Sequence, residues 1–196
     1  PVITYLFIRQ FKCLMVGDKE VGKKTLLNSL ARMHFSQEES STDKYLVNVM
    51  VHKRILSFSI DVVSDPDQIS NLSNDYHILL LCFSAANRQS FKNITTWADR
   101  CKSKLTSSSE DIAFTPKDPL ELTALWKGKA PKIVLIGTHL DVALDKNVKQ
   151  ELLVSFREAD RMAASVDAAL YRECSSTRLT GIADLFVSVS GLFTPL

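Results

Sequence analysis

The sequence predicts an α/β fold, with a mostly parallel six-stranded sheet covered by helices on both faces. Short apolar runs, typical of buried strands, alternate along the 196 residues with segments whose apolar residues recur at helical spacing. Two adjacent segments instead alternate between apolar and polar residues, which is typical of an antiparallel hairpin. We therefore expect one antiparallel edge strand on an otherwise parallel sheet.

The predicted strands are of two kinds. Continuous apolar runs indicate central strands that are buried on both faces, whereas alternating polarity indicates the hairpin at the edge. The hairpin is expected at 45–52 and 54–61, with its turn near His52 and Lys53. The central strands are expected at 11–16, 78–83, 132–136 and 170–174.

Four segments carry apolar residues on one helical face. These predicted helices span 23–33, 90–105, 146–166 and 179–192. The polar stretches 34–44 and 62–75 are predicted to be loops. Residues 106–130 contain three consecutive serines and two prolines, which indicates an insertion within a single domain covering 1–196.

Composition excludes several classes of function. Lysine and arginine number 24 against 22 acidic residues, so the net charge of +2 gives no basic footprint for nucleic acid. The longest apolar run, 78–83, is far shorter than a membrane span, and residues 193–196 hold no prenylation cysteine, so we expect no direct membrane anchor. The four cysteines form no CxxC pair, which favours a reducing, cytoplasmic location.

One short motif carries specific chemistry. The segment 17–23, GDKEVGK, follows the first predicted strand and opens the first predicted helix, which is the context of a phosphate-binding loop. Gly17 and Gly22 let the backbone curl so that its N–H groups point at phosphate oxygens, and Lys23 adds a positive charge. The full motif has Ser or Thr after this lysine, but here Lys24 follows. The alternative is a strand-to-helix turn with no ligand.

At these residues the chain resembles the small GTPases, most closely the Rho/Rac branch. YLVNVMV at 45–51 is similar to the second strand of Rho proteins, and HILLLCFS at 77–84 to their fourth. IVLIGTHLD at 133–141 resembles the guanine-specificity motif, and ECSST at 173–177 the last base-contacting loop. THLD also resembles the Roc domains of leucine-rich-repeat kinases, so the subfamily stays open.

The resemblance implies a P-loop NTPase-type G domain that binds GTP or GDP. Asp141 matches the aspartate that accepts two hydrogen bonds from guanine, although a loop aspartate without a ligand is an equal alternative. His139 replaces the lysine that covers the base. The nucleotide-binding positions implied by the resemblance are Gly17, Lys19, Glu20, Val21, Gly22, Lys23, Lys24, Thr25, Thr138, His139, Asp141, Cys174, Ser175 and Ser176.

The metal site of the family is altered in this sequence. Lys24 replaces the Ser or Thr that ligates Mg²⁺, and an ammonium repels a cation, so a normal magnesium site is not expected. Asp61 and Ser40 match the remaining metal-contacting positions. Two alternatives stay open for Lys24: its ammonium takes the place of the metal, or it points to solvent or pairs with Asp61.

The hydrolytic machinery also departs from the family pattern. Asp65 stands at the position of the glutamine that orients the attacking water, and Ser64 replaces a glycine that senses the γ-phosphate. Lys19 replaces a glycine that lies against that glutamine. Because positioning and charge stabilisation supply nearly all of phosphoryl-transfer catalysis, we expect weak or no GTP hydrolysis. No residue is assigned as catalytic.

Three functions remain open. The first is a guanine-nucleotide-binding module for signalling or protein interaction, with hydrolysis impaired or absent. The second is a nucleotide-free pseudo-GTPase scaffold within a larger protein, and the third is a slow but working GTPase switch. An adenine-nucleotide enzyme is disfavoured by Asp141. Protein partners are expected at 34–44, 62–75 or 106–130.

Overall fold

The computed structural model describes residues 9–33, 37–40, 43–51, 54–105, 130–145 and 147–193. Within these ranges seven strands form one sheet in the order β2-β3-β4-β1-β5-β6-β7. The strands are β1 Arg9–Val16, β2 Gln37–Ser40, β3 Lys44–Val51, β4 Arg54–Val63, β5 Ile78–Ser84, β6 Lys132–Thr138 and β7 Ala168–Glu173.

The pairing confirms the predicted fold class. β1 pairs in parallel with β4 and β5, and β6 pairs in parallel with β5 and β7. β3 and β4 form the expected antiparallel hairpin, with Val51 opposite Arg54. All six predicted strands are therefore present.

The prediction of a loop over all of 34–44 was wrong. β2 lies within this stretch and pairs antiparallel with β3, so it forms the outer edge of the sheet. Its sequence, QEES, has no apolar residue. A polar edge strand is held by backbone hydrogen bonds rather than by a buried face, so periodicity gives no sign of it.

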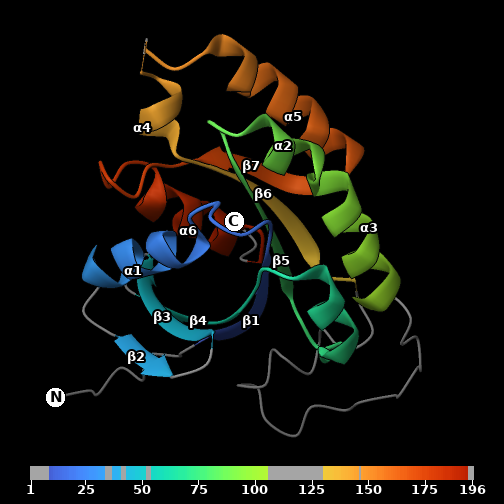
Figure 1. Ribbon diagram of the computed structural model, residues 1–196. Coiled ribbons are helices and arrows are strands. Elements are labelled where there is room, and N and C mark those ends of the chain that lie inside the picture. Colours follow the sequence, from blue (N-terminus) through green and yellow to red (C-terminus); the bar gives the residue numbers. More distant parts are fainter. Residues whose placement is uncertain are drawn as a thin grey trace, which may run out of the picture.

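Helices cover both faces of the sheet, as Figure 1 shows. α1 (Lys23–Met33) and α6 (Ile182–Gly191) lie on one face. α2 (Arg88–Lys92), α3 (Ile94–Leu105) and α5 (Phe156–Ser165) lie on the other. The short helix α4 (Leu140–Ala143) follows β6 at the edge where the parallel strands end.

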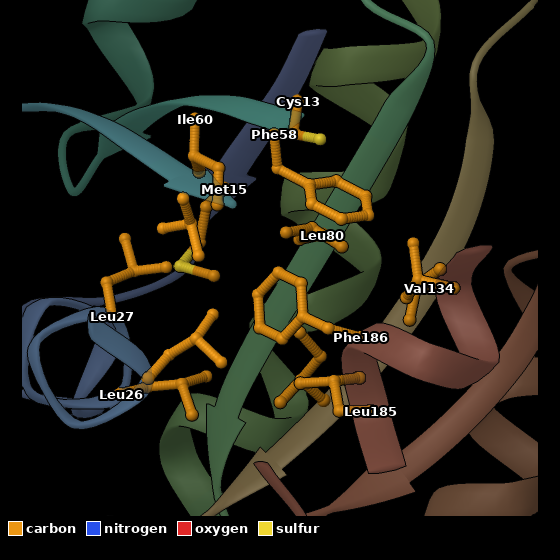
Figure 2. Packing of buried hydrophobic residues seen from close by; sticks show 14 of the residues in the cluster. Cys13, Met15, Leu26, Leu27, Phe58, Ile60, Leu80, Val134, Leu185 and Phe186 are labelled. Carbon is orange, nitrogen blue, oxygen red and sulfur yellow. The ribbon is translucent and has the colours of Figure 1, made fainter. Parts of the chain in front are cut away.

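The core between the sheet and the α1–α6 face is tightly packed. Figure 2 shows Phe58 of β4 against Phe186 of α6, with ring centroids 5.5 Å apart and the rings nearly perpendicular. Leu26 and Leu27 of α1 close the same cluster, and each is fully buried. This packing fixes α1, and with it the loop between β1 and α1, against the sheet.

The opposite core lies between the sheet and α3. All seven residues of β5 are buried, as the continuous apolar run predicts. Ile94 and Trp97 of α3 pack there with Ile69, which belongs to the 3₁₀ helix η1 (Pro66–Asn71). Residues 62–75, predicted to be a loop, thus begin with the end of β4 and contain η1.

Three predicted helices were too long or were undivided. The segment 90–105 is two helices, α2 and α3, separated at Asn93. The segment 179–192 is helical only from Ile182, because Thr180 instead pairs with Ser175 in an isolated bridge.

The segment 146–166 is helical as α5 only from Phe156, preceded by the 3₁₀ turn η3 (Gln150–Leu152). A capping box begins α5, in which the Ser155 hydroxyl and the Glu158 carboxylate each accept the other residue's backbone N–H. Arg88 also donates to the carbonyl oxygens of Glu151 and Leu153, which holds this stretch out of a helix.

Some predictions fall outside the described residues. These are residues 106–129 of the insertion predicted at 106–130, the proposed turn at 52–53, and Lys146. Across the described ranges, no helix has the length and apolar character needed to cross a bilayer.

Candidate functional site

The loop between β1 and α1 has the backbone that a phosphate-binding loop requires. Gly17 has φ +149°, and a Cβ built there would lie 2.2 Å from the carbonyl oxygen of Cys82 in β5. Only glycine fits this close approach. Glu20 and Gly22 also have positive φ, at 65° and 85°, so the chain curls between the strand and the helix.

Lys23 lies at the centre of this loop. Its ammonium donates to the carbonyl oxygens of Gly17 and Asp18, both at 2.6 Å, and only 4% of the residue is exposed. Burial lowers the pKa of Lys23. The loop therefore holds one buried positive charge, positioned by the loop's own carbonyl groups.

The other predicted residues of the loop and of the start of α1 differ in exposure. Lys19 and Glu20 are exposed, and Val21 is buried. Lys24 and Thr25, at the start of α1, are exposed. Among these predicted residues, Lys23 is the buried charge.

Asp18 was not among the predicted site residues. Its two carboxylate oxygens accept from the Asn93 side-chain amide at 2.7 Å and from the Trp97 indole N–H at 2.8 Å. The sequence offered a signal, because Asn93 and Trp97 lie four residues apart, on one side of the predicted helix.

The predicted base-binding residues come from two loops that meet beyond the ends of β6 and β7. The Ser175 hydroxyl donates to Asp141 at 2.6 Å, and this bond is the main reason that the pKa of Asp141 is lowered. The hydroxyl oxygen of Ser175 also accepts from the Arg178 backbone N–H at 3.1 Å. Asp141 and Ser175, 34 residues apart in the sequence, therefore lie side by side.

Two contacts connect the base-side loop to the phosphate loop. Thr138 is buried, and its hydroxyl donates to the Val21 carbonyl at 2.5 Å, with the Phe83 carbonyl at 3.0 Å. His139, which has φ +55°, lies over Gly22, where an added Cβ would be 3.0 Å from the imidazole Cε1. The predicted phosphate-side and base-side residues are thus neighbours in space.

Cys174 and Ser176 complete this set. Cys174 is fully buried, and burial raises the pKa of its thiol to about 12. Its carbonyl oxygen accepts from the Leu140 backbone N–H, which joins the two base-side loops. The carbonyl oxygen of Ser176 accepts from the Ser29 hydroxyl of α1 at 3.3 Å.

The predicted metal-side residues are not brought together. The Lys24 ammonium lies 2.5 Å from the carboxylate of Asp43, the residue before β3. It does not pair with Asp61. Asp61 lies within β4, opposite Leu14 of β1, and its carboxylate accepts from the Tyr76 hydroxyl at 2.6 Å. The backbone of Ser40 is the end of β2, and its side chain lies outside the described residues.

Asp61 and Lys24 also lie on different sides of the sheet. The strand neighbours of Asp61, Ile60 and Val62, pack in the core on the α1 face, so the Asp61 side chain faces the α3 side with Tyr76. Among the described residues, no three His, Cys, Asp or Glu side chains gather as a metal-ligand group.

Asp65, at the position that the family fills with glutamine, has a structural contact. It is the N-cap of η1, and its carboxylate accepts from the Asp67 backbone N–H at 3.0 Å. This is the ordinary use of an aspartate at the start of a helical turn.

The fold is that of a class of nucleotide-binding domains, in which a glycine-bounded loop follows the first strand and further loops lie at the same edge of the sheet. The chain belongs to the Ras family, whose model matches residues 12–193. It is a small GTPase domain by family, and this membership implies guanine nucleotide as the ligand.

The chain is also similar to a Rho protein. It is 24% identical over 188 residues to the GTP-binding protein rho3 of Schizosaccharomyces pombe, an alignment that covers 91% of this chain and 80% of that protein. The predicted resemblance to small GTPases is thereby confirmed, and the likeness to Rho proteins is distant.

Proposed function

We propose that this chain binds guanine nucleotide, without requiring Mg²⁺, and acts as a protein-interaction module with weak or no GTP hydrolysis. The observation that carries the proposal is the preassembled pair of subsites. Lys23 rests on the loop carbonyls, and Asp141 is held by Ser175 at 2.6 Å. Both subsites lie on the same edge of the sheet.

The residues at the family's metal positions do not fit a magnesium site. Mg²⁺ requires oxygen ligands in a near-octahedral arrangement, and Lys24 offers an ammonium at the position of one of them. The Asp61 carboxylate is engaged by Tyr76 on the α3 side of the sheet. The nucleotide's phosphates would instead be neutralised by Lys23 and by the loop N–H groups, with Lys24 close by along α1.

The same region supports weak hydrolysis. Asp65 is committed to capping η1, and a carboxylate lacks the paired donor and acceptor with which an amide orients water. Phosphoryl transfer depends on the positioning of the reactants and on charge stabilisation. The lack of the metal and the lack of the water-orienting amide should therefore both lower the rate of hydrolysis. We expect turnover below the ~10⁻⁴ s⁻¹ of unassisted small GTPases.

Nucleotide titration tests the binding. GDP, GTP and ADP are added to nucleotide-free protein in Mg²⁺ and in EDTA, and heat is recorded. We expect sub-micromolar affinity for GDP and GTP in both buffers, and none for ADP. Lys23→Ala should weaken GDP binding by about 10- to 100-fold, since it removes charge-assisted bonds to phosphate. Lys149→Ala, at an exposed lysine outside the predicted nucleotide-binding set, is the matched control.

A second variant tests the metal claim. Lys24→Thr restores a hydroxyl at the metal position and should make GDP affinity rise with Mg²⁺. Radiolabelled GTP under single-turnover conditions measures hydrolysis in both proteins. Failure of all nucleotides to bind wild type would favour the nucleotide-free scaffold, and turnover at the rate of ordinary small GTPases would favour the working switch.

The interaction surfaces are part of the same proposal. We infer that partners contact residues 34–44, 62–75 or 106–130. The first segment includes β2 at the open edge of the sheet, and the second includes η1. Gln68→Ala, at an exposed residue of η1, should weaken partner binding without changing GDP affinity if partners contact 62–75.

A further inference from the structure

Asp18 is one of two carboxylates in the phosphate loop 17–23, the other being the exposed Glu20, and its surroundings are unusual for an anion-binding loop. Negative charge beside a phosphate site is unfavourable unless donors hold it away from the ligand. Here the Asn93 amide and the Trp97 indole supply one neutral donor to each carboxylate oxygen, at 2.7 and 2.8 Å. These two bonds direct the Asp18 side chain to α3.

The donors are themselves fixed. Trp97 is 2% exposed and packs in the core between α3 and the sheet. The side-chain oxygen of Asn93 accepts from the Gln89 amide of α2 at 3.0 Å, so the Asn93 amide nitrogen is turned to Asp18. The Asp18 carboxylate is therefore held by a rigid helix rather than by a mobile surface group.

The backbone of the same residue holds the phosphate-binding lysine. The carbonyl oxygens of Gly17 and Asp18 are the two acceptors of the Lys23 ammonium. A Cβ at Gly17 would overlap the Cys82 carbonyl, so that end of the loop is fixed by β5. The Asp18 side chain fixes the next residue of the loop, through Asn93 and Trp97.

We propose that Asp18 is a positioning residue, which ties the phosphate loop to α3 and so fixes the carbonyl groups that aim Lys23. The part concerning phosphate rests on the proposed function. Position, rather than negative charge, is the property that matters, because the ammonium bonds to the Asp18 backbone and not to its carboxylate.

Chemical labelling of Lys23 tests the proposal without any ligand. The protein is treated with limiting acetic anhydride, and the acylation of each lysine is followed by peptide mass spectrometry. Lys24, whose side chain is 57% exposed, is the internal control in the same helix. In wild type, Lys23 should be protected relative to Lys24.

Three variants separate position from charge. Asp18→Ala removes both bonds, and Lys23 should be labelled about tenfold faster, as expected for loss of about 1.4 kcal/mol of protection. Asp18→Asn loses the charge but keeps an oxygen for Trp97, and its amide can donate to Asn93 once the Asn93 and Gln89 side-chain amides both turn over, so Lys23 should stay protected. Asp99→Ala, an exposed carboxylate on α3, is the matched control and should change nothing.

Trp97→Phe provides a second route if Asp18→Ala does not fold. It removes one donor and keeps an aromatic ring, so Lys23 labelling should rise by a smaller factor than in Asp18→Ala. Unchanged labelling of Lys23 in folded Asp18→Ala, or in Trp97→Phe, would overturn the proposal. The proposal would also be overturned if Lys23 were labelled as fast in Asp18→Asn as in Asp18→Ala. The negative charge of Asp18, rather than its position, would then protect Lys23.

Ligand binding then tests the consequence. Asp18→Ala should weaken GDP by about tenfold but leave guanosine, which lacks phosphates, unchanged. A purely structural role would weaken both equally, which would contradict the proposal. Absence of GDP binding in wild type would refute the proposed function alone, since the labelling of Lys23 would still decide the role of Asp18.

Discussion

Gly17→Ala is the sharpest single test of the loop geometry. The new Cβ would lie 2.2 Å from the Cys82 carbonyl oxygen, whereas real Cβ atoms essentially never approach within 3.0 Å. The loop or β5 must therefore move by at least about 0.8 Å, although the neighbouring residues of β1 and β5 are buried and closely packed. Overpacking of this kind costs about 1–3 kcal/mol, and the positive φ costs a similar amount.

The total predicted loss of unfolding free energy is about 2–5 kcal/mol. For a chain of this size each kcal/mol lowers Tm by about 2–4 °C, so thermal unfolding followed by circular dichroism resolves the effect. Chemical denaturation gives the free energy directly, provided that the slope with denaturant is unchanged.

Gly191→Ala is the matched control. Gly191 is the last residue of α6, and no atom lies within 4 Å of a Cβ built there. Alanine should leave stability within about 1 kcal/mol of wild type, on the stabilising side, because its helix propensity is higher. If Gly17→Ala were as stable as Gly191→Ala, the close approach of the loop to β5 would be refuted.

Three further predictions concern charge. Ser175→Ala should raise the pKa of Asp141, because its main stabilising hydrogen bond is lost, so that GDP affinity titrated from pH 7 downward falls at a higher pH than in wild type. Arg88 and Ser155 lower the pKa of Glu158 from 4.5 to about 2, so this carboxylate contributes stability above pH 4.5 that is lost as pH falls toward 2. The partly exposed Arg88–Glu158 pair should account for about 1 kcal/mol of this loss of unfolding free energy. In Glu158→Gln, this part of the pH dependence of the unfolding free energy should be absent. Lys24→Ala breaks an exposed ion pair with Asp43 and should change the unfolding free energy by less than about 1 kcal/mol; a larger loss in denaturant titration would mean that this pair anchors the hairpin.

The sequence predicted an element correctly where the residues of that element alone decide its structure. α1 spans the predicted residues without change, because its apolar face and the glycine-bounded loop before it are both encoded locally. β5 is buried throughout for the same reason. The helix at 146–166 was overextended although Ser155 and Glu158 form a capping box that was visible in the sequence.

In the candidate site, too, the features encoded by neighbouring residues were predictable and the contacts between distant elements were not. The positions of Lys23 and Asp141 were predictable, because a strand, a loop and a helix in sequence place such residues at the carboxyl ends of parallel strands. The side-chain partners of Lys24, Asp61 and Asp18 were not predictable. Each partner lies on a different element of the fold, and which side chains meet depends on how these elements pack. Lys24, for example, pairs with Asp43, the residue before β3, and not with Asp61, which one of the sequence-based alternatives named.

The most direct test of the account is the affinity of nucleotide-free protein for GDP in excess EDTA, compared with the same titration in Mg²⁺. The proposed phosphate and base subsites, and the lack of a magnesium-binding arrangement around Lys24 and Asp61, predict sub-micromolar binding that is the same in both buffers. Loss of binding in EDTA, or its absence in both buffers, would contradict it.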